Sequence, residues 1–370
     1  MRILLTLLLT TPLLAQSLDE RVTRALPSLI ETYKTLHAAP ELSTQEKNTS
    51  AFVAARLREL GYEVTERVGK YPEPELTCYG VVGILRNGQG PTVLIRSDMD
   101  ALPVTEQTGV AYASRNAGVM HACGHDVHMT TLIGTAKMLA DTKSQWRGTV
   151  MLIGQPAEEG VKGASAMLRD GLYERFGRPN YAIAVHDWAT APAGTVGYRA
   201  GYVMANSDSV DITVRGVGGH GAAPHAAKDP VVLAAQIVMA LQTIVSRQSS
   251  PLDPVVLTVG SIHGGTRRNI IPDEVKLELT VRTYKPEVRR AVLAAIERVA
   301  RGIALAAGVP EDRTPIIKWY EAEAAEATWN DPALTMRLVA AVKRELGDAN
   351  VMEIDPAMVG EDFGRFGLGR

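Results

Sequence analysis

Residues 149–160 read TVMLIGQPAEEG, an apolar stretch that ends in two adjacent glutamates, Glu158 and Glu159. The first five residues are typical of a buried strand. Adjacent side chains on an extended segment point in opposite directions, so one carboxylate could bind a metal ion while the other faces a water molecule. Metal-assisted hydrolysis needs a carboxylate in each of these two roles, because the metal lowers the pKa of the water and a free carboxylate takes its proton. Two solvated glutamates at a strand end are the alternative.

The same arrangement, with polar residues directly after an apolar strand, occurs twice more. Residues 92–95 are followed by Asp98 and Asp100, and residues 181–185 by His186. The carboxylates of Asp98 and Asp100 could orient a metal-binding imidazole. Acidic residues of a surface loop are the alternative explanation. A histidine at the end of a buried strand fits a site at the edge of the sheet, or else a hydrogen-bonded core residue.

The densest group of potential metal ligands is the segment 121–128, HACGHDVH. The thiol of Cys123 and the imidazole of His125 are two residues apart, so both could reach one metal ion, and Gly124 lets the backbone bend between them. A buried structural cysteine or a satisfied core histidine would explain either residue alone. Four such groups in eight residues, just before a predicted helix, favour metal binding.

Strands and helices alternate along the chain in two different patterns. In the first part, strands separated by a helix indicate an α/β sheet that binds ligands beyond the strand ends. From about residue 200, the order β-α-β-β-α-β is that of a ferredoxin-like unit, which we interpret as a domain inserted into the first one. The predicted strands lie at 81–85, 92–95, 149–153, 181–185, 209–215, 255–262, 275–282 and 316–320. The predicted helices lie at 18–60 with a turn at 38–42, and at 128–140, 230–246, 286–307 and 331–346.

The composition is that of an ordinary globular protein. The chain has 370 residues, of which 46% are hydrophobic and 22% charged. Its net charge of −2 gives no basic surface for nucleic acid or for an anionic membrane. A small molecule is therefore the expected partner.

The first residues have the layout of a secretory signal peptide at 1–15. Arg2 precedes an almost wholly apolar run at 3–14, and Ala15 is followed by a polar stretch. A membrane anchor is the alternative, but the run is shorter than the ~20 residues that a bilayer requires. We therefore expect a secreted or periplasmic protein. A disulfide between Cys78 and Cys123 is the structural alternative to metal binding, although a small domain held together by disulfides would need more cysteines.

Seven stretches of this sequence carry a resemblance to a known family. They read LHAAPELSTQE, SDMDALPVTEQTG, GVMHACGHDVHM, QPAEEGVKGA, GGHGAAPH, GGTRRNIIPD and GEDF. In these motifs and their order, the chain resembles the amidohydrolase branch of the di-metal aminoacylase and carboxypeptidase clan, which includes hippurate hydrolase and indole-acetyl-amino-acid hydrolases. The resemblance covers about 36–366. It implies a main α/β domain that holds two metal ions and an inserted ferredoxin-like domain that serves as a lid or for dimerisation.

The resemblance also assigns roles in the metal centre. It implies two divalent metal ions, zinc, manganese or cobalt, and Glu158 as the general base. Asp100 matches the position that orients a ligand, and Asp98 stands where other branches of the clan carry a metal-binding histidine. The implied metal ligands are Cys123, His125, Glu159 and His186.

Further residues are implied to bind the substrate. His220 would polarise the scissile carbonyl or stabilise the oxyanion, and in related enzymes the equivalent histidine can come from the neighbouring subunit. Asn269 and Arg282 match positions that hold the substrate's carboxylate, which is a natural use for an arginine. A homodimer through the inserted domain is implied as well.

One feature departs from the family pattern, because no histidine follows His263, whereas family members usually supply one more ligand near the C-terminus. A truncated chain or a genuine loss would explain this. We therefore expect a signal peptide at 1–15, a catalytic metal-binding domain at 18–199 and 323–370 with a truncated C-terminal part, and an inserted domain at 200–322.

The expected function is metal-dependent hydrolysis of the amide bond of N-acyl amino acids or similar small amides with a free carboxylate. A dipeptidase and an N-acetyl-diaminopimelate deacetylase are alternatives within the same chemistry. A non-catalytic protein that binds a small ligand on the same fold is an alternative of another class.

Overall fold

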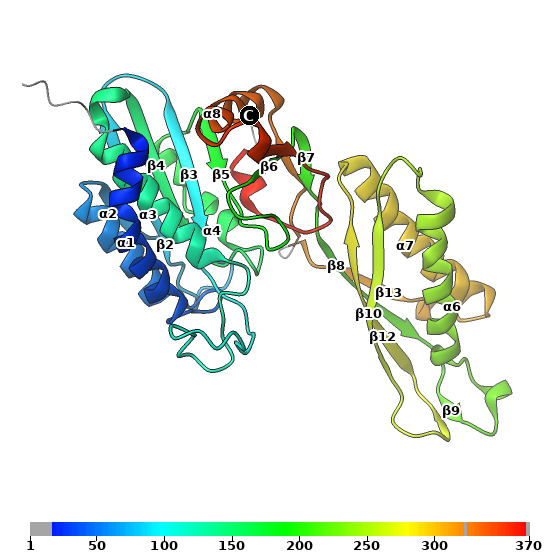
Figure 1. Ribbon diagram of the computed structural model, residues 1–370. Coiled ribbons are helices and arrows are strands. Elements are labelled where there is room, and N and C mark those ends of the chain that lie inside the picture. Colours follow the sequence, from blue (N-terminus) through cyan, green and yellow to red (C-terminus); the bar gives the residue numbers. More distant parts are fainter. Residues whose placement is uncertain (1–16, 322–323, 368–370) are drawn as a thin grey trace, which may run out of the picture.

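The computed structural model describes residues 17–321 and 324–367, which form two lobes (Figure 1). The expected signal peptide at 1–15 lies outside the described residues, so export stays a prediction. The first lobe contains a five-stranded sheet, and the second a four-stranded sheet. Both lobes mix helices with strands, as expected for an α/β protein.

The sheet of the first lobe brings three strand ends to one edge. Its order is β1-β2-β4-β3-β5. β3 pairs in parallel with both β4 and β5, whereas β1 and β2 run antiparallel to their neighbours. The residues that follow β3, β4 and β5 therefore emerge at the same edge. The strands are β1 (Glu63–Val68), β2 (Gly80–Asn87), β3 (Thr92–Asp98), β4 (Gly148–Gln155) and β5 (Tyr181–Ala184).

Helices cover both faces of this sheet. Along β4, Val150 and Leu152 enter the core on one face, while Met151 and Ile153 enter the core on the other. This alternation follows from the pleat of a strand that is buried on both sides. The first face is covered by α1 (Leu18–His37), α2 (Lys47–Glu59) and α3 (His125–Asp141). The second face is covered by α4 (Gly163–Arg169), α5 (Leu172–Phe176) and the short helix Phe363–Gly367.

The second lobe is an antiparallel sheet with two helices on one face (Figure 1). Its strand order is β10-β12-β8-β13, and the chain runs through it as β-α-β-β-α-β. Every second residue of β8, including Val210, Ile212 and Val214, is buried under the helices. The elements are β8 (Asp208–Arg215), α6 (Pro230–Thr243), β10 (Val256–Gly264), β12 (Glu274–Arg282), α7 (Pro286–Ala306) and β13 (Ile316–Trp319), with the short pair β9 (Gly219–His220) and β11 (Ile270–Ile271).

Two short strand pairs bring together the segments that enter and leave the second lobe. β6 (Val196–Tyr198) pairs with β15 (Val351–Glu353), and β7 (Gly201–Met204) pairs with β14 (Thr328–Asn330). The helix α8 (Pro332–Leu346) lies between β14 and β15 in the chain. The second lobe is thus connected through two adjacent segments, which is the geometry of an inserted unit.

The helical segment Pro230–Gln248 has the length and the apolar composition of a membrane span. However, Leu233, Ile237 and Leu241 are almost completely buried in the core of the second lobe. One face of this segment therefore packs on the sheet of the second lobe, while the other face is exposed, as at Met239.

Candidate metal centre

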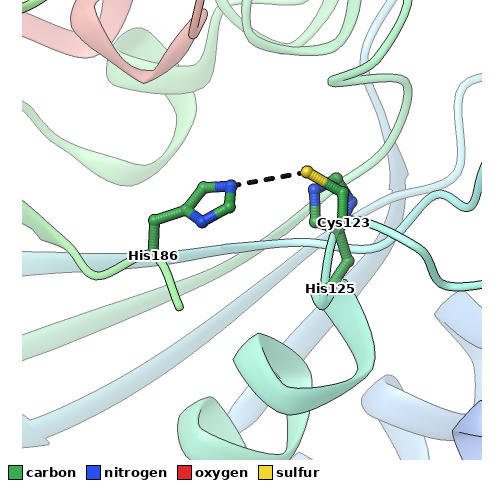
Figure 2. Close-up of side chains that lie close together, drawn as sticks. All are labelled: Cys123, His125 and His186. Atoms are coloured by element: carbon green, nitrogen blue, oxygen red, sulfur yellow. Dashed lines mark hydrogen bonds between the residues drawn. The ribbon is translucent and has the colours of Figure 1, made fainter. Parts of the chain in front are cut away.

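The four polar clusters of the sequence meet at the edge where β3, β4 and β5 end. Figure 2 shows the side chains of Cys123 and His186 facing each other, with His125 beside them. The Sγ atom of Cys123 lies 3.6 Å from Nε2 of His186. These three residues offer ligand atoms close enough to bind one ion, and so do His125, Glu158 and Glu159. His125 belongs to both groups, so the two potential sites are adjacent.

The start of α3 requires a glycine. Gly124 precedes the helix with φ of 78°, a left-handed conformation. A Cβ atom at this position would lie 2.2 Å from Oδ1 of Asp187. Gly124 therefore allows Cys123 and His125 to approach the loop that carries His186. The helix begins at His125, three residues earlier than its apolar pattern predicts.

The histidine tautomers leave metal-binding lone pairs free. Nδ1 of His125 donates to the backbone carbonyl of Asp100 at 2.8 Å, and Nδ1 of His186 donates to the carbonyl of Asp187 at 2.6 Å. In the neutral form of each ring, which is the form that binds a metal ion, Nε2 is unprotonated and turned to the other side. Nε2 of His125 is buried and has no hydrogen-bond partner among the described residues, and the same is true of Oε1 of Glu159, 3.9 Å away. Buried polar atoms rarely stay unpaired, so the two atoms fit a shared cation.

The charges around His125 also favour a cation. Burial alone would lower the pKa of His125, but the carboxylate of Asp98 and the hydrogen bond to Asp100 outweigh it and raise the pKa to about 12. Burial, together with the charge of Asp100, raises the pKa of Glu159, against the charge of His125. The site therefore has an excess of acidic groups that a divalent ion would neutralise.

Glu158 is buried beside these ligands, with Oε2 3.9 Å from Nε2 of His125. Burial raises the pKa of Glu158 well above the ordinary value, and the nearby charges of Glu361 and Asp362 add to the effect. A carboxylate with a raised pKa in a pocket is suited to accept a proton during catalysis.

Asp100 holds the site together with both its backbone and its side chain. The carbonyl fixes the ring of His125, as described above. The carboxylate accepts hydrogen bonds from the backbone N–H groups of Glu158 and Glu159, each at 3.0 Å, and from the hydroxyl of Ser43 at 2.6 Å. Asp100 thus orients His125 through its main chain. Through its side chain it orients the turn at residues 157–161, which carries Glu158 and Glu159 and is called the glutamate turn below.

A buried network that the sequence motifs did not reveal lies beneath the site. Asp98 bonds to Nδ1 of His128 with one oxygen and to Arg96 with the other, each at 2.6 Å. Against the effect of burial, the charge of Arg96 lowers the pKa of Asp98. Oδ2 of Asp98 remains 3.6 Å from Nε2 of His125. Both oxygens of Asp98 therefore have partners, and the residue borders the potential metal site.

The guanidinium of Arg96 is the centre of this network. It contacts Glu361 with two nitrogens, at 2.8 and 3.2 Å, and also reaches Gln155 and Asp362. Arg96 is 4% exposed, so these charges interact with little screening by water. The network connects the ends of β3 and β4 to the GEDF motif.

Two residues singled out in the sequence stay outside the cluster. His121 is buried, has no hydrogen-bond partner for either ring nitrogen among the described residues, and shares no group of potential metal ligands. Burial lowers its pKa to about 4. Cys78 is buried under β1 next to Gly69, where burial raises its pKa to about 11. Both cysteines are free, so the alternative of a Cys78–Cys123 disulfide is wrong.

The residues expected to bind the substrate are distributed over the second lobe. His220 and Asn269 lie side by side, because β9 pairs with β11 and the N–H of Gly221 donates to the carbonyl of Asn269. They are at the end of that lobe remote from the first lobe (Figure 1). Arg282 ends β12 on the opposite side, next to the first lobe, where its Nη1 would be 3.4 Å from a Cβ on Gly360. Since the nine residues of β12 span about 27 Å, Asn269 and Arg282 do not meet within one chain.

The chain was compared with known families and relatives. The pattern of the peptidase family M20/M25/M40 matches residues 94–370. The chain is 38% identical over 342 residues to an N-acetyl-L-cysteine deacetylase of Bacillus subtilis. This match covers 90% of this chain and 76% of the relative. It is also 38% identical over 333 residues to a hippurate hydrolase of Campylobacter jejuni, covering 90% of this chain and 82% of the relative.

Solved structures show the same fold. The crystal structure of a dinuclear metal-binding peptidase of the M20 family from Bacillus subtilis matches with a TM-score of 0.76 and 32% identity, over 95% of this chain and 86% of the other. An aminohydrolase structure from methicillin-resistant Staphylococcus aureus matches with a TM-score of 0.84 and 35% identity, over 95% and 87% of the two chains.

Proposed function

Because the chain belongs to the peptidase family M20/M25/M40, we propose that it hydrolyses the amide bond of N-acyl amino acids or of similar small amides with a free carboxylate. Its membership makes it a hydrolase. The observation that carries the proposal is a pair of buried atoms, Nε2 of His125 and Oε1 of Glu159, which have no hydrogen-bond partner among the described residues and lie beside the buried carboxylate of Glu158. This is an arrangement for binding metal next to a proton acceptor.

Two divalent metal ions are the cofactor that fits these residues. Thiolate and imidazole ligands suit zinc, and the additional carboxylate is compatible with manganese or cobalt. When bound, the ions lower the pKa of a water molecule and polarise the amide carbonyl. The proposed ligands are Cys123, His125, Glu159 and His186.

The residues of the chain then supply the proton transfers. Glu158 takes a proton from the attacking water and delivers it to the departing amine, a role for which its raised pKa is suited. His220 supplies a hydrogen bond to the amide oxygen. Its Nδ1 accepts from the N–H of Ala222 at 3.1 Å, so the proton of the neutral ring is on Nε2. Arg282, which has no ion-pair partner among the described residues, is available for the substrate's carboxylate at the first lobe.

His220 and Asn269 belong to the site of a second copy in this proposal, because both are at the remote end of their own lobe. Two features of the second lobe support a homodimer. β10 is an edge strand, and its outer side pairs with no other strand of the described residues. On the exposed side of α6, Val232 is 54% exposed and Met239 is 71% exposed. The ferredoxin-like second lobe would then act as the dimerisation domain and as the lid over the partner's site.

The test is turnover by the chain without residues 1–15, the segment proposed to direct export. Release of the amino acid would be measured with hippurate, N-acetylcysteine, N-acetyl-diaminopimelate and dipeptides, in the presence of Mn²⁺ or Zn²⁺. We expect Glu158→Gln to lower kcat by about 10²- to 10⁴-fold, which is the usual contribution of a general base. Glu345→Gln, on the exposed side of α8, is the matched control and should behave like the wild type.

Each alternative has its own outcome. Hydrolysis of dipeptides alone would indicate a dipeptidase, and hydrolysis of N-acetyl-diaminopimelate alone would indicate the corresponding deacetylase. Binding of these compounds without any turnover would contradict the proposal and favour a binding protein. Turnover that survives Glu158→Gln would remove Glu158 from its proposed role.

A further inference from the structure

The turn that carries Glu158 and Glu159 has an unusual backbone. Ala157 has φ of 48° and Val161 has φ of 53°, both in the left-handed region that non-glycine residues rarely adopt. For the β-branched Val161 this conformation is especially unfavourable. Such a turn persists only when its surroundings hold it in place. The residues that hold it therefore control where the two glutamates point.

Two buried carboxylates hold three successive N–H groups of this turn. Asp100 accepts from Glu158 and Glu159, as described above. The third group, the N–H of Ala157, donates to Oε1 of Glu46 at 2.8 Å. Glu46 is completely buried, although it is separated from Ala157 by 111 residues of sequence. Its role has no counterpart in the functions assigned above.

The position of Glu46 makes it a bridge between two loops. The same oxygen, Oε1, also accepts from the backbone N–H of Thr44 at 3.0 Å, and Thr44 itself has a left-handed φ of 68°. Ser43, one residue earlier, donates to the carboxylate of Asp100. The segment before α2 therefore supports the glutamate turn twice, directly through Glu46 and indirectly through Asp100.

We propose that Glu46 is a positioning residue of the hydrolytic site, which fixes the turn of Glu158 and Glu159 through the N–H of Ala157. The proposal rests on the proposed roles of those two glutamates. Glu46 does not touch substrate or metal. It acts by keeping the metal-binding carboxylate and the proton-accepting carboxylate at fixed places on a turn that would otherwise relax.

Only one oxygen of Glu46 is needed for this role. Its second oxygen, Oε2, is buried and has no partner among the described residues. Burial, and next the charge of Asp100, raise the pKa of Glu46 to about 8. A glutamine offers the same accepting oxygen on an uncharged side chain. An alanine removes it.

Glu41 provides a matched control at the same helix. Its carboxylate accepts from the backbone N–H groups of Asn48 and Thr49, at 2.9 and 2.8 Å, and so caps the start of α2. It makes no hydrogen bond to the glutamate turn. A substitution at Glu41 therefore shows how the loss of the cap of α2 changes stability and activity, without a direct effect on the glutamate turn.

The experiment compares Glu46→Ala, Glu46→Gln and Glu41→Ala in the full chain. Three quantities would be measured: kcat and KM on the best substrate, the affinity for Zn²⁺ by calorimetry, and amide hydrogen exchange of a peptide that contains residues 157–161. For Glu46→Ala we expect about a tenfold or greater loss in kcat and in Zn²⁺ affinity, a smaller change in KM, and faster exchange of the turn. Glu46→Gln should restore all three to within about threefold of the wild type. Glu41→Ala should lower the melting temperature but leave kcat and the exchange of the turn near the wild-type values.

The proposal would be overturned if Glu46→Ala kept its kcat and Zn²⁺ affinity, if Glu46→Gln were as defective as Glu46→Ala, or if Glu41→Ala lost activity to the same extent. If the wild type hydrolysed no compound of the panel, the proposed function would fail. The exchange of residues 157–161 and the Zn²⁺ affinity would still decide whether Glu46 holds the turn.

Discussion

The two lobes differ in where they keep their polar side chains. The first lobe buries a charged network around Arg96 and its potential metal ligands at the end of a sheet. The core of the second lobe is built from apolar residues such as Ile212, Ile237 and Leu277. The polar residues that we assign to substrate binding in that lobe, His220 and Asn269, lie on exposed loops and short strands.

In the proposed mechanism, this difference separates two tasks of the active site. Metal ligands and a proton acceptor must be held in place before the substrate arrives, and a buried network provides that rigidity. Groups that close over a substrate must move, so they are expected on the surface of a lobe that can move as a unit, such as the second lobe with its apolar core. Substitutions in the buried network are therefore expected to change stability, and substitutions of the exposed residues of the second lobe are expected to change only turnover.

The largest effect is expected for Arg96→Met. The substitution would leave Asp98, Glu361 and Asp362 buried without their counter-charge, which costs about 3–5 kcal/mol of the free energy of unfolding when a buried ion pair is broken. Differential scanning calorimetry should show a lower melting temperature for the first lobe.

Arg289→Met in the second lobe is the matched comparison. Arg289 forms a two-pronged contact with Asp208, but 29% of its side chain is exposed. The loss should therefore be smaller, about 1–2 kcal/mol. Equal losses for the two arginines would contradict the contrast between a buried network in one lobe and a partly solvated ion pair in the other.

The next effect concerns turnover alone. His220→Ala should lower kcat by about 10²- to 10³-fold, the usual result of removing a hydrogen-bond donor to a developing oxyanion. Because His220 is exposed, the melting temperature and the Zn²⁺ affinity should stay near the wild-type values. Steady-state kinetics and calorimetry on the same preparation would check this.

Mixing experiments sharpen the same prediction. If His220 serves the partner's site, refolding Glu158→Gln chains together with His220→Ala chains gives mixed dimers with one intact site. Activity should reappear in the mixture although each variant alone is almost inactive. A mixture that stays as inactive as its components would place His220 in the site of its own chain.

The smallest effect is a pH dependence of stability in the first lobe. His37 bonds to Asp126 with Nδ1 at 2.6 Å and to Glu106 with Nε2 at 3.2 Å. Burial lowers the pKa of His37, but the hydrogen bonds to the two carboxylates outweigh burial and raise it. A raised pKa in the folded state gives stability that is complete below the unfolded value of about 6.5 and is lost as the pH rises through the folded pKa.

We therefore expect His37→Gln to be less stable than the wild type by about 1–2 kcal/mol below pH 6.5, with a smaller difference at higher pH. Melting temperatures of both proteins between pH 5.5 and 9 would show the trend. The Arg289→Met variant serves as the control, since an arginine does not titrate in this range. A difference between His37→Gln and wild type that is constant with pH would refute the interpretation.

The sequence allowed prediction of the elements and residues that have a local pattern. The strands that became β2, β3, β4, β8, β10 and β12 are apolar or alternate clearly, and their bounds agree with the structure to within three residues. The potential ligands at their ends could be found because ionisable residues directly after a buried strand are conspicuous. β1 escaped prediction because Glu63–Val68 reads EVTERV and is mostly half-exposed.

The rest could not be predicted because it depends on contacts distant in sequence. Arg96 and Glu361 have no local feature that pairs them, and GEDF was recognised as a motif without a contact partner. The role of Asp100 was predicted only as the orientation of a ligand. Its hydrogen bonds to the N–H groups of Glu158 and Glu159 depend on the pairing of β3 with β4. The hydrogen bond from Ala157 to Glu46 is equally invisible until α2 is placed on the sheet.

The pairing of Arg96 with Glu361 also determines when the buried network of the first lobe can form during synthesis. The partners are 265 residues apart, so at about 5–20 residues per second the ribosome needs roughly 13–53 s to deliver the second after the first. The whole second lobe, β8 to β13, emerges during that interval and has its own core. On the nascent chain, the second lobe is therefore synthesised before the first lobe can form its buried network, and the pairing around Arg96 can form only after Glu361 has been translated.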